Sequence, residues 1–205
     1  MKTHIYVDGF NLYYRAVKGT KYKWLDLNAL CQKLLPKARI ERLNYYTARV
    51  AARPNDPGQP TRQDTYFRAL RTIPHLRIIE GNFISKPARL PLSDNLNKIV
   101  SVLRTEEKGS DVNLASHLVH DGHMGEYEQA IVITNDSDLA EPIRIVRDEL
   151  RLNVGILCPS KYLNPQLKAV ITFAKPIRAG VIQASQFPET LLDAVGQFHK
   201  PTEWR

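Results

Sequence analysis

The sequence has few cysteines and no long apolar run. Its two cysteines, Cys31 and Cys158, each lie within an apolar stretch, so a disulfide scaffold is excluded and both thiols are expected to be reduced and buried. No segment approaches the roughly 18 consecutive apolar residues of a membrane span. His4, Asp8 and Asn11 interrupt any signal-peptide core. We therefore expect a cytoplasmic protein with no membrane partner.

A glycine-rich dinucleotide-binding motif is also missing. Gly9 stands alone after the first apolar run, without the G-x-G-x-x-G pattern that holds a pyrophosphate. This disfavours an enzyme that acts on a small molecule, such as a hydroxylase using the same crevice, and leaves that class as a lesser alternative. Internal repeats and low-complexity segments are not found either.

Composition indicates an ordinary globular chain with a basic surplus. Hydrophobic residues make up 43% of the 205 residues and charged residues 24%, so a core can form. The length suits one large domain. The 29 Lys and Arg residues exceed the 21 Asp and Glu residues by 8, which makes a polyanion a candidate partner. Simple solubility is the alternative explanation of this charge.

Segments typical of strands and helices alternate along the chain. Strands are expected at residues 3–7, 40–50, 76–85, 130–133 and 154–157, with helical patterns between most of them. This predicts an α/β fold, a three-layer α/β/α sandwich with a mostly parallel central sheet. Residues 86–97 are expected to be a mobile connection and 98–104 a strand that forms a hairpin with the preceding one. Residues 188–205 are expected to be a docked helix with a polar tail.

Acidic side chains follow two of the most apolar strands. Asp8 ends the first strand, and Asp136 and Asp138 follow the strand at 130–133. Ligands of open parallel sheets bind beyond the carboxyl ends of the strands, where Asp111, at the start of a helix, can also reach. Clustered carboxylates stay ionised only beside a cation, and oxygen ligands favour Mg²⁺ or Mn²⁺. Such an ion can activate water for attack on a phosphodiester.

Helix capping is the alternative role for these carboxylates. Asp136, Asp138 and Asp111 could each cap the helix that follows. Asp8 has no obvious capping role beyond the next turn, so it favours the metal site most.

Basic and aromatic residues alternate after the first strand, a combination that suits single-stranded nucleic acid. A solvated basic face over packed tyrosines is the alternative. Three arginines near a proline-rich loop could form the far wall of such a site. The basic residues are Arg15, Lys18, Lys21 and Lys23 in the first group and Arg49, Arg53 and Arg62 in the second; the aromatic ones are Tyr13, Tyr14, Tyr22 and Trp24.

Three histidines, His117, His120 and His123, recur every third residue near a helix end. A zinc site is conceivable there, but no cysteine is near and the spacing matches no standard ligand set. Solvent-facing histidines are the simpler interpretation.

Three motifs in order resemble those of the NYN domains, a branch of the PIN-like nuclease superfamily. They are VDGFNLY at residues 7–13, KGSDVNLA at 108–115 and ITNDSDL at 133–139. The resemblance covers about residues 2–175, and the three motifs are specific in combination. It implies a PIN-like fold, Mg²⁺- or Mn²⁺-dependent cleavage of RNA, and a domain at 1–175 followed by a C-terminal extension at 176–205 packed on it.

The resemblance also assigns residues. Asp8, Asp111, Asp136 and Asp138 match the metal-binding acidic positions, and Asn11 matches the polar partner of the first aspartate. Thr134 matches the hydroxyl residue before the acidic pair. Asn135 stands where many members have glycine, which alters the turn but keeps both carboxylates. Because members differ in whether activity has been shown, the family alone does not establish catalysis.

For a nuclease, Asp8, Asp111 and Asp136 would hold one ion, and Asp138 would hold a second or orient the attacking water. Lys108 could steady the phosphate or the leaving group. A module that binds nucleic acid or a protein partner without catalysis is the alternative. The apolar C-terminal residues could complete the core or form a homodimer; they are Phe187, Leu191, Leu192, Phe198 and Trp204.

Overall fold

The computed structural model describes residues 1–204, and a seven-stranded sheet forms its centre. The strand order is β4-β3-β2-β1-β5-β6-β7, and all neighbouring pairs are parallel except β3 with β4. The predicted α/β fold with a mostly parallel sheet is therefore confirmed. The strands are β1 (Lys2–Asp8), β2 (Arg39–Ala48), β3 (Leu76–Pro91), β4 (Ile99–Lys108), β5 (Gln129–Ile133), β6 (Asn153–Cys158) and β7 (Phe173–Pro176).

Strand β1 is central, and both of its faces are buried. Ile5 and Val7 pack into one core cluster, whereas Tyr6 between them packs into the other. In β5, Ile131 and Val132 divide in the same way. A strand buried on both faces needs apolar residues at successive positions, which explains the short continuous apolar runs of the sequence.

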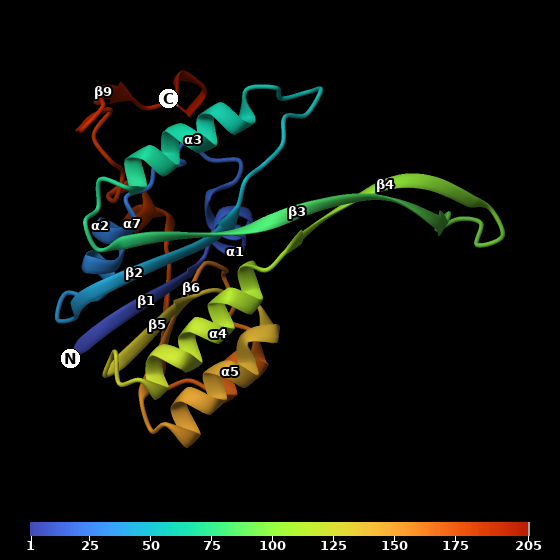
Figure 1. Cartoon of the computed structure of the whole chain (residues 1–205). Helices are drawn as coiled ribbons and strands as arrows, with labels where there is room; N and C mark the ends of the chain where they lie inside the picture. Colours follow the sequence, from blue (N-terminus) through green and yellow to red (C-terminus); the bar gives the residue numbers. More distant parts are fainter. Residues whose placement is uncertain (205) are drawn as a thin grey trace.

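Helices cover both faces of the sheet, as Figure 1 shows: α2, α3 and α7 lie on one face, and α4 and α5 on the other. No helix within residues 1–204 is long and apolar enough to cross a membrane. The helices are α1 (Gly9–Leu12), α2 (Leu27–Leu34), α3 (Gln59–Leu70), α4 (Ser110–His123), α5 (Ala140–Arg144), α6 (Pro165–Ala169) and α7 (Ala179–Gln183). Single turns of π-helix (Tyr13–Val17, Ile145–Glu149) and 3₁₀-helix (Ser137–Leu139, Thr202–Trp204) extend or link them.

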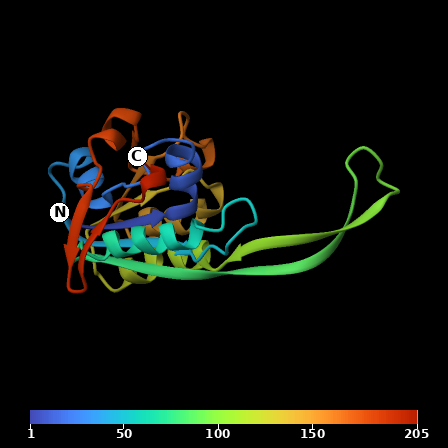
Figure 2. The same cartoon turned by 90° about the horizontal axis from the view of Figure 1, so that it is seen from above.

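Strands β3 and β4 form a long hairpin that projects from the body of the molecule (Figures 1 and 2). Their antiparallel pairing runs from Asn82 with Lys108 to Pro91 with Ile99. The expected hairpin is confirmed, but the mobile connection at residues 86–97 is wrong up to residue 91, where β3 ends. The prolines of this part of β3 led to the wrong prediction. They lie in a two-stranded ribbon with open edges, where the missing backbone N–H of proline is tolerated.

The C-terminal segment is not the helix expected at residues 188–205. It forms a small hairpin, β8 (Thr190–Asp193) and β9 (Gly196–His199), before the last 3₁₀ turn. Phe187 and Phe198 are buried in the same core cluster as Trp24, whose indole Nε1 donates a hydrogen bond to the Pro188 carbonyl (2.8 Å). These residues therefore complete the core, while Leu192 stays exposed. The division of the chain at residue 175 stays a prediction.

Gly9 begins α1 at a point where no side chain fits. A Cβ at this position would lie 2.6 Å from the Tyr46 carbonyl oxygen and 2.8 Å from the Tyr45 ring. Gly9→Ala is therefore expected to destabilise the fold by about 1–3 kcal/mol, because β2 must shift. Gly180→Ala is a matched control, since its Cβ would meet no atom within 4 Å. Urea denaturation of both variants measures the difference, and equal stability of the two would contradict this packing.

Candidate active site

The site lies where the order of strands reverses. Along the chain β2 and β3 follow on one side of β1, whereas β5 and β6 lie on the other. The carboxyl ends of β1 and β5 therefore flank the crevice at which open α/β sheets bind ligands. Asp8 is the last residue of β1, and Thr134 to Asp136 directly follow β5.

Hydrogen bonds join these two strand ends. The Thr134 hydroxyl donates to Asp8 Oδ2 (3.0 Å) and accepts from the Asp136 backbone N–H (3.1 Å). The Asn135 backbone N–H donates to Asn11 Oδ1 (3.0 Å). The first and third sequence motifs are thus held in one fixed arrangement, with Asn11 and Thr134 as its links.

Asp111 reaches the same place from β4 and α4. Gly109 has a φ of 104°, in the left-handed region open to glycine, and turns the chain from β4 into α4. Ser110 then donates from its backbone N–H and its hydroxyl to Glu107 (3.1 and 2.7 Å). Asp111 follows in the first turn of α4, so Glu107 and Asp111 are brought to one edge.

A cavity of about 340 Å³ collects these side chains, and we call it the acidic cavity. It brings together Asp8, Asp111 and Asp136, as the sequence predicted. Glu107 was not predicted. It lies on a strand of an antiparallel hairpin, and the rule that ligands bind at the carboxyl ends of strands holds for parallel sheets. The lining residues are Asp8, Phe10, Asn11, Tyr14, Val50, Arg53, Gln59, Phe83, Thr105, Glu107, Ser110, Asp111 and Asp136.

Burial and mutual repulsion act on the carboxylates. Asp8 is only 5% exposed, and burial, followed by the charges of Asp111 and Asp136, raises its pKa to about 6. The hydrogen bonds from Asn11 and Thr134 oppose that rise. Burial also raises the pKa of Asp111, with further contributions from Asp136, Glu107 and Asp138. The cavity therefore holds negative charge that lacks compensation.

Such a set of oxygen donors fits a hard divalent cation, which would lower the cost of keeping these groups ionised. The side chains do not, however, form a complete coordination shell. Within residues 1–204, no three Asp, Glu, His or Cys side chains lie close enough together to hold an ion as placed. The donor chemistry fits Mg²⁺ or Mn²⁺, and an ion would have to draw the carboxylates inward.

Two of the carboxylates cap the helical turns that follow them. Asp8 Oδ1 accepts from the Asn11 backbone N–H (2.8 Å) and caps α1, the turn that directly follows it, which is the capping role that the sequence left open for Asp8. Asp136 Oδ1 likewise accepts from the Asp138 backbone N–H (3.0 Å). The Asp111 and Asp138 carboxylates accept no hydrogen bond from residues 1–204. In Asp8 and Asp136 the cap uses one carboxylate oxygen, and the second oxygen does not take part in it.

Two expected catalytic residues lie outside the cavity lining. The Lys108 side chain is 60% exposed, and its ammonium pairs with Glu106 at 3.0 Å. On a β-strand, Lys108 and Glu106 point to the face opposite Glu107, which explains why Lys108 turns away. Asp138 is exposed and acts on the site through its charge beside Asp111.

The expected basic wall is only partly formed. Arg53 lines the acidic cavity. Arg49 instead pairs with Asp64 and Glu80, and Arg62 pairs with Asp56 (2.5 Å) and Glu203 (3.3 Å). These two guanidinium groups are neutralised within the protein, which leaves Arg53 as the member of this group that lines the cavity.

One member of the first basic group lies beside the cavity. The Lys18 ammonium lies 4.7 Å from the centre of the Tyr14 ring, and Tyr14 lines the acidic cavity while being 55% exposed. Lys21 lies over Tyr22, and Arg15 is exposed. Lys18 and Tyr14 therefore form an exposed cation and aromatic pair beside the carboxylates.

The histidines do not form a metal site within residues 1–204. Instead, His117 Nδ1 makes a hydrogen bond with the Tyr46 hydroxyl (3.1 Å), and the two rings lie 5.7 Å apart. This packs α4 on β2.

Asn135, where many family members have glycine, gains two contacts here. Its Nδ2 donates to the Tyr162 carbonyl (3.0 Å), and its Oδ1 accepts from the Asn164 backbone N–H (2.8 Å). The side chain thus ties the loop after β6 to the site, and both neighbouring carboxylates keep their places.

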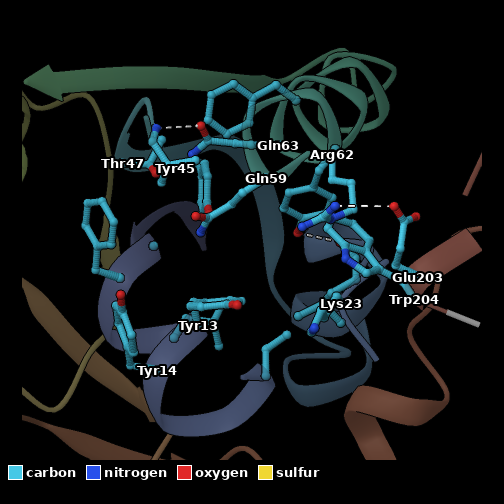
Figure 3. A pocket seen from close by; sticks show the side chains of 18 of the residues that line it. Tyr13, Tyr14, Lys23, Tyr45, Thr47, Gln59, Arg62, Gln63, Glu203 and Trp204 are labelled. Atoms are coloured by element: carbon cyan, nitrogen blue, oxygen red, sulfur yellow. Dashed lines mark hydrogen bonds and ion pairs between the residues drawn. The ribbon is translucent and has the colours of Figure 1, made fainter. Parts of the chain in front are cut away.

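A second cavity of about 200 Å³ adjoins the first, and we call it the aromatic cavity (Figure 3). Sequence reasoning missed it because its walls come from distant parts of the chain. Four residues line both cavities: Phe10, Tyr14, Val50 and Gln59. The other lining residues used below are Tyr13, Lys23, Tyr45, Asp56, Arg62, Gln63, Tyr66, Phe67, Glu203 and Trp204.

The NYN domain family matches residues 2–173, which include all three motifs and every carboxylate of the acidic cavity. The chain belongs to the NYN domain family. The family relationship suggests the PIN-like nuclease superfamily, divalent metal ions and nucleic acid as a partner.

Two similar proteins extend this result. The 6-hydroxy-3-succinoylpyridine 3-monooxygenase HspA of Pseudomonas putida (strain DSM 28022 / S16) is 30% identical, over 93% of this chain and 72% of that protein. The crystal structure of VPA0982, a protein of unknown function from Vibrio parahaemolyticus RIMD 2210633, has a TM-score of 0.59 at 14% identity. That match covers 86% of this chain and 93% of the other, and it shows the fold alone.

Asp8→Asn is expected to change how stability depends on pH. The pKa of Asp8 is about 6 in the folded protein, above its ordinary 3.8, so its ionisation costs stability above the folded value. That cost disappears below the ordinary value. In metal-free buffer the variant should gain about 3 kcal/mol at pH ~8 and nothing below pH ~4.

Urea denaturation across this pH range provides the measurement. Asp94→Asn, in the exposed turn of the long hairpin, is the matched control. If the stability of both variants follows the wild-type pH dependence, then ionisation of Asp8 does not destabilise the folded protein.

Proposed function

We propose that this protein hydrolyses phosphodiester bonds of RNA with Mg²⁺ or Mn²⁺ at the acidic cavity. The observation that carries the proposal is the convergence of Asp8, Asp111 and Asp136 at the strand-order reversal. Burial and neighbouring negative charges raise the pKa of Asp8 and of Asp111, and a divalent cation would relieve that repulsion. Asp8, Asp111 and Asp136 would hold the ion, and Asp138 would hold a second ion or orient water. A bound ion supplies charge neutralisation and a more acidic water molecule.

The chain's own residues prepare this chemistry. Asn11 and Thr134 each donate a hydrogen bond to the Asp8 carboxylate, so this group keeps one orientation. Ser110 fixes Glu107 beside Asp111. Arg53 in the cavity lining is the cation placed to bind the phosphate.

Single-stranded RNA is the proposed substrate. The exposed Tyr14 ring with Lys18 above it offers a stacking surface and a cation at the cavity rim. A homodimer stays a prediction. Because Phe187 and Phe198 are buried within this chain, the exposed apolar side chains near the end of the long hairpin, such as Leu96 and Ile99, are a surface of the right kind for it.

Metal removal and Asp8→Asn test the nuclease. EDTA is expected to abolish cleavage of an unstructured RNA, and Mn²⁺ to restore it. Asp8→Asn should lower the cleavage rate by at least about 100-fold, because a ligand and its charge are lost. Asp148→Asn, which changes an exposed carboxylate paired with Arg147, is the matched control.

Full activity of Asp8→Asn would overturn the assignment. A metal-binding readout accompanies the rate: Mn²⁺ should raise the Tm of the wild type and of Asp148→Asn more than that of Asp8→Asn. Equal shifts in all three proteins would mean that the acidic cavity holds no ion. An ion without cleavage would favour the non-catalytic binding module.

Hydroxylation of a small heteroaromatic compound is a second candidate function. The similarity to a protein named a 6-hydroxy-3-succinoylpyridine 3-monooxygenase favours it, together with the aromatic cavity beside the acidic one. In such a reaction one atom of O₂ enters the ring as a hydroxyl group. The other leaves as water, with two electrons from a reduced nicotinamide dinucleotide and protons from solvent.

Oxygen uptake separates this function from the nuclease. The protein is incubated with 6-hydroxy-3-succinoylpyridine, air and a reduced nicotinamide dinucleotide, and the product is sought by mass spectrometry. The second function predicts substrate-dependent oxygen uptake and a pyridine product whose new hydroxyl oxygen comes from ¹⁸O₂ supplied in the gas phase. Uptake no greater than in the absence of substrate would reject it.

A further inference from the structure

The aromatic cavity has the walls of a binding site for a flat ring. Tyr66 stands nearly perpendicular to Tyr45 (88°, centroids 6.4 Å apart) and to Trp204 (72°, 6.1 Å). Tyr13 forms another wall, and Phe67 lies behind them. Small-molecule sites are typically lined by aromatic side chains with a few placed polar groups. At about 200 Å³ the cavity is smaller than the roughly 300–1,000 Å³ of sites for larger ligands, so it suits a single small ring.

Polar groups that lack protein partners line this cavity. Within residues 1–204 the Tyr13 hydroxyl, the Lys23 ammonium and the Gln59 amide make no hydrogen bond or ion pair. In Figure 3, Gln59 extends toward Tyr13, while Lys23 lies to the right of Tyr13. Gln63, by contrast, uses its amide on the Ala48 carbonyl and the Val50 N–H (2.9 Å each). Gln59 and Tyr13 are therefore placed to bind ring substituents.

Among residues 1–204, most charged groups of the aromatic cavity pair with one another, and Lys23 is the cation of its lining that stays available. Arg62 is the arginine in its lining, and Asp56 and Glu203 both pair with it. Its side chain is only 16% exposed, so these pairs hold the guanidinium away from a ligand's anionic group. A planar ring with polar substituents matches the remaining groups.

The C-terminal turn closes this cavity. Glu203 pairs with Arg62 of α3 at 3.3 Å, and the Trp204 ring packs on Trp24 (6.2 Å) and Tyr66 (6.1 Å). Both residues lie beyond residue 173, where the family match ends. The wall formed by Glu203 and Trp204 therefore lies outside the part of the chain that the family match covers.

We propose that the aromatic cavity binds one planar heteroaromatic ring, presented either by a nucleic-acid base or by a free heterocycle, and that Trp204 closes it. Phe10, Tyr14, Val50 and Gln59 line both cavities, so the rest of the ligand extends toward the carboxylates. The ring bound in the aromatic cavity therefore determines which bond or atom of the ligand lies beside the carboxylates of the acidic cavity. This inference concerns binding and does not depend on either proposed reaction.

Titration calorimetry with two sets of probes in metal-free buffer tests the ring site. One set is the four ribonucleosides and the other is uncharged hydroxypyridines, because an anionic group on a probe would be repelled by the metal-free carboxylates of the adjoining cavity. We expect saturable binding in at least one set, and the set that binds identifies the source of the ring. Tyr13→Leu and Gln59→Leu should each raise Kd by at least about tenfold, because stacking or a hydrogen bond is lost. Trp204→Ala should weaken binding similarly.

Tyr162→Leu is the matched control, since Tyr162 is 74% exposed on a loop outside the aromatic cavity. Its Kd should stay within about twofold of the wild type. Circular dichroism verifies that each variant is folded, and the Gln59 variant keeps the test decisive if Tyr13→Leu does not fold. The proposal is overturned if neither probe set binds, or if the Tyr13 and Gln59 variants bind as tightly as Tyr162→Leu. Because no metal ion is present, a failed cleavage assay does not affect this result.

Discussion

The Thr134 hydroxyl is the contact on which the arrangement of the site depends. It donates to Asp8 at the end of β1 and accepts from the Asp136 N–H after β5, so one side chain joins two strands that are 126 residues apart in sequence. Each strand end also holds its own carboxylate by a local cap, and the Thr134 hydroxyl ties the two ends to each other. Joined, they hold Asp8 buried, where water cannot offset its charge and where a cation would.

Two cavities of different character meet at this point. The acidic cavity gathers carboxylates from β1, β4, α4 and the loop after β5. The aromatic cavity gathers rings that include those of α3 and of the C-terminal turn. Gln59, at the start of α3, belongs to both. A charged centre beside a ring-sized recess suits a base-reading nuclease and also suits an enzyme that modifies a heterocycle. This shared geometry gives a physical reason why one fold could support either chemistry.

Much of the site followed from local sequence, because Asp8 and Asp136 directly follow apolar strands that any parallel sheet must bury. Glu107 could not be predicted, since its position depends on the register of an antiparallel hairpin. The same hairpin turns Lys108 away from the cavity. Arg62 was expected to be free, but its partner Glu203 is 141 residues away and only the folded chain brings them together. Local patterns thus predicted strands and strand ends, whereas tertiary pairing decided which charges remain available.

The most direct test of this account is a crystal soaked in Mn²⁺, with the anomalous signal located relative to Asp8, Asp111 and Asp136. The account predicts a peak in the acidic cavity within about 2.0–2.6 Å of carboxylate oxygens of at least two of these residues. A signal elsewhere on the protein, or none at a concentration that saturates other manganese sites, would contradict the claim that these carboxylates meet to bind a cation.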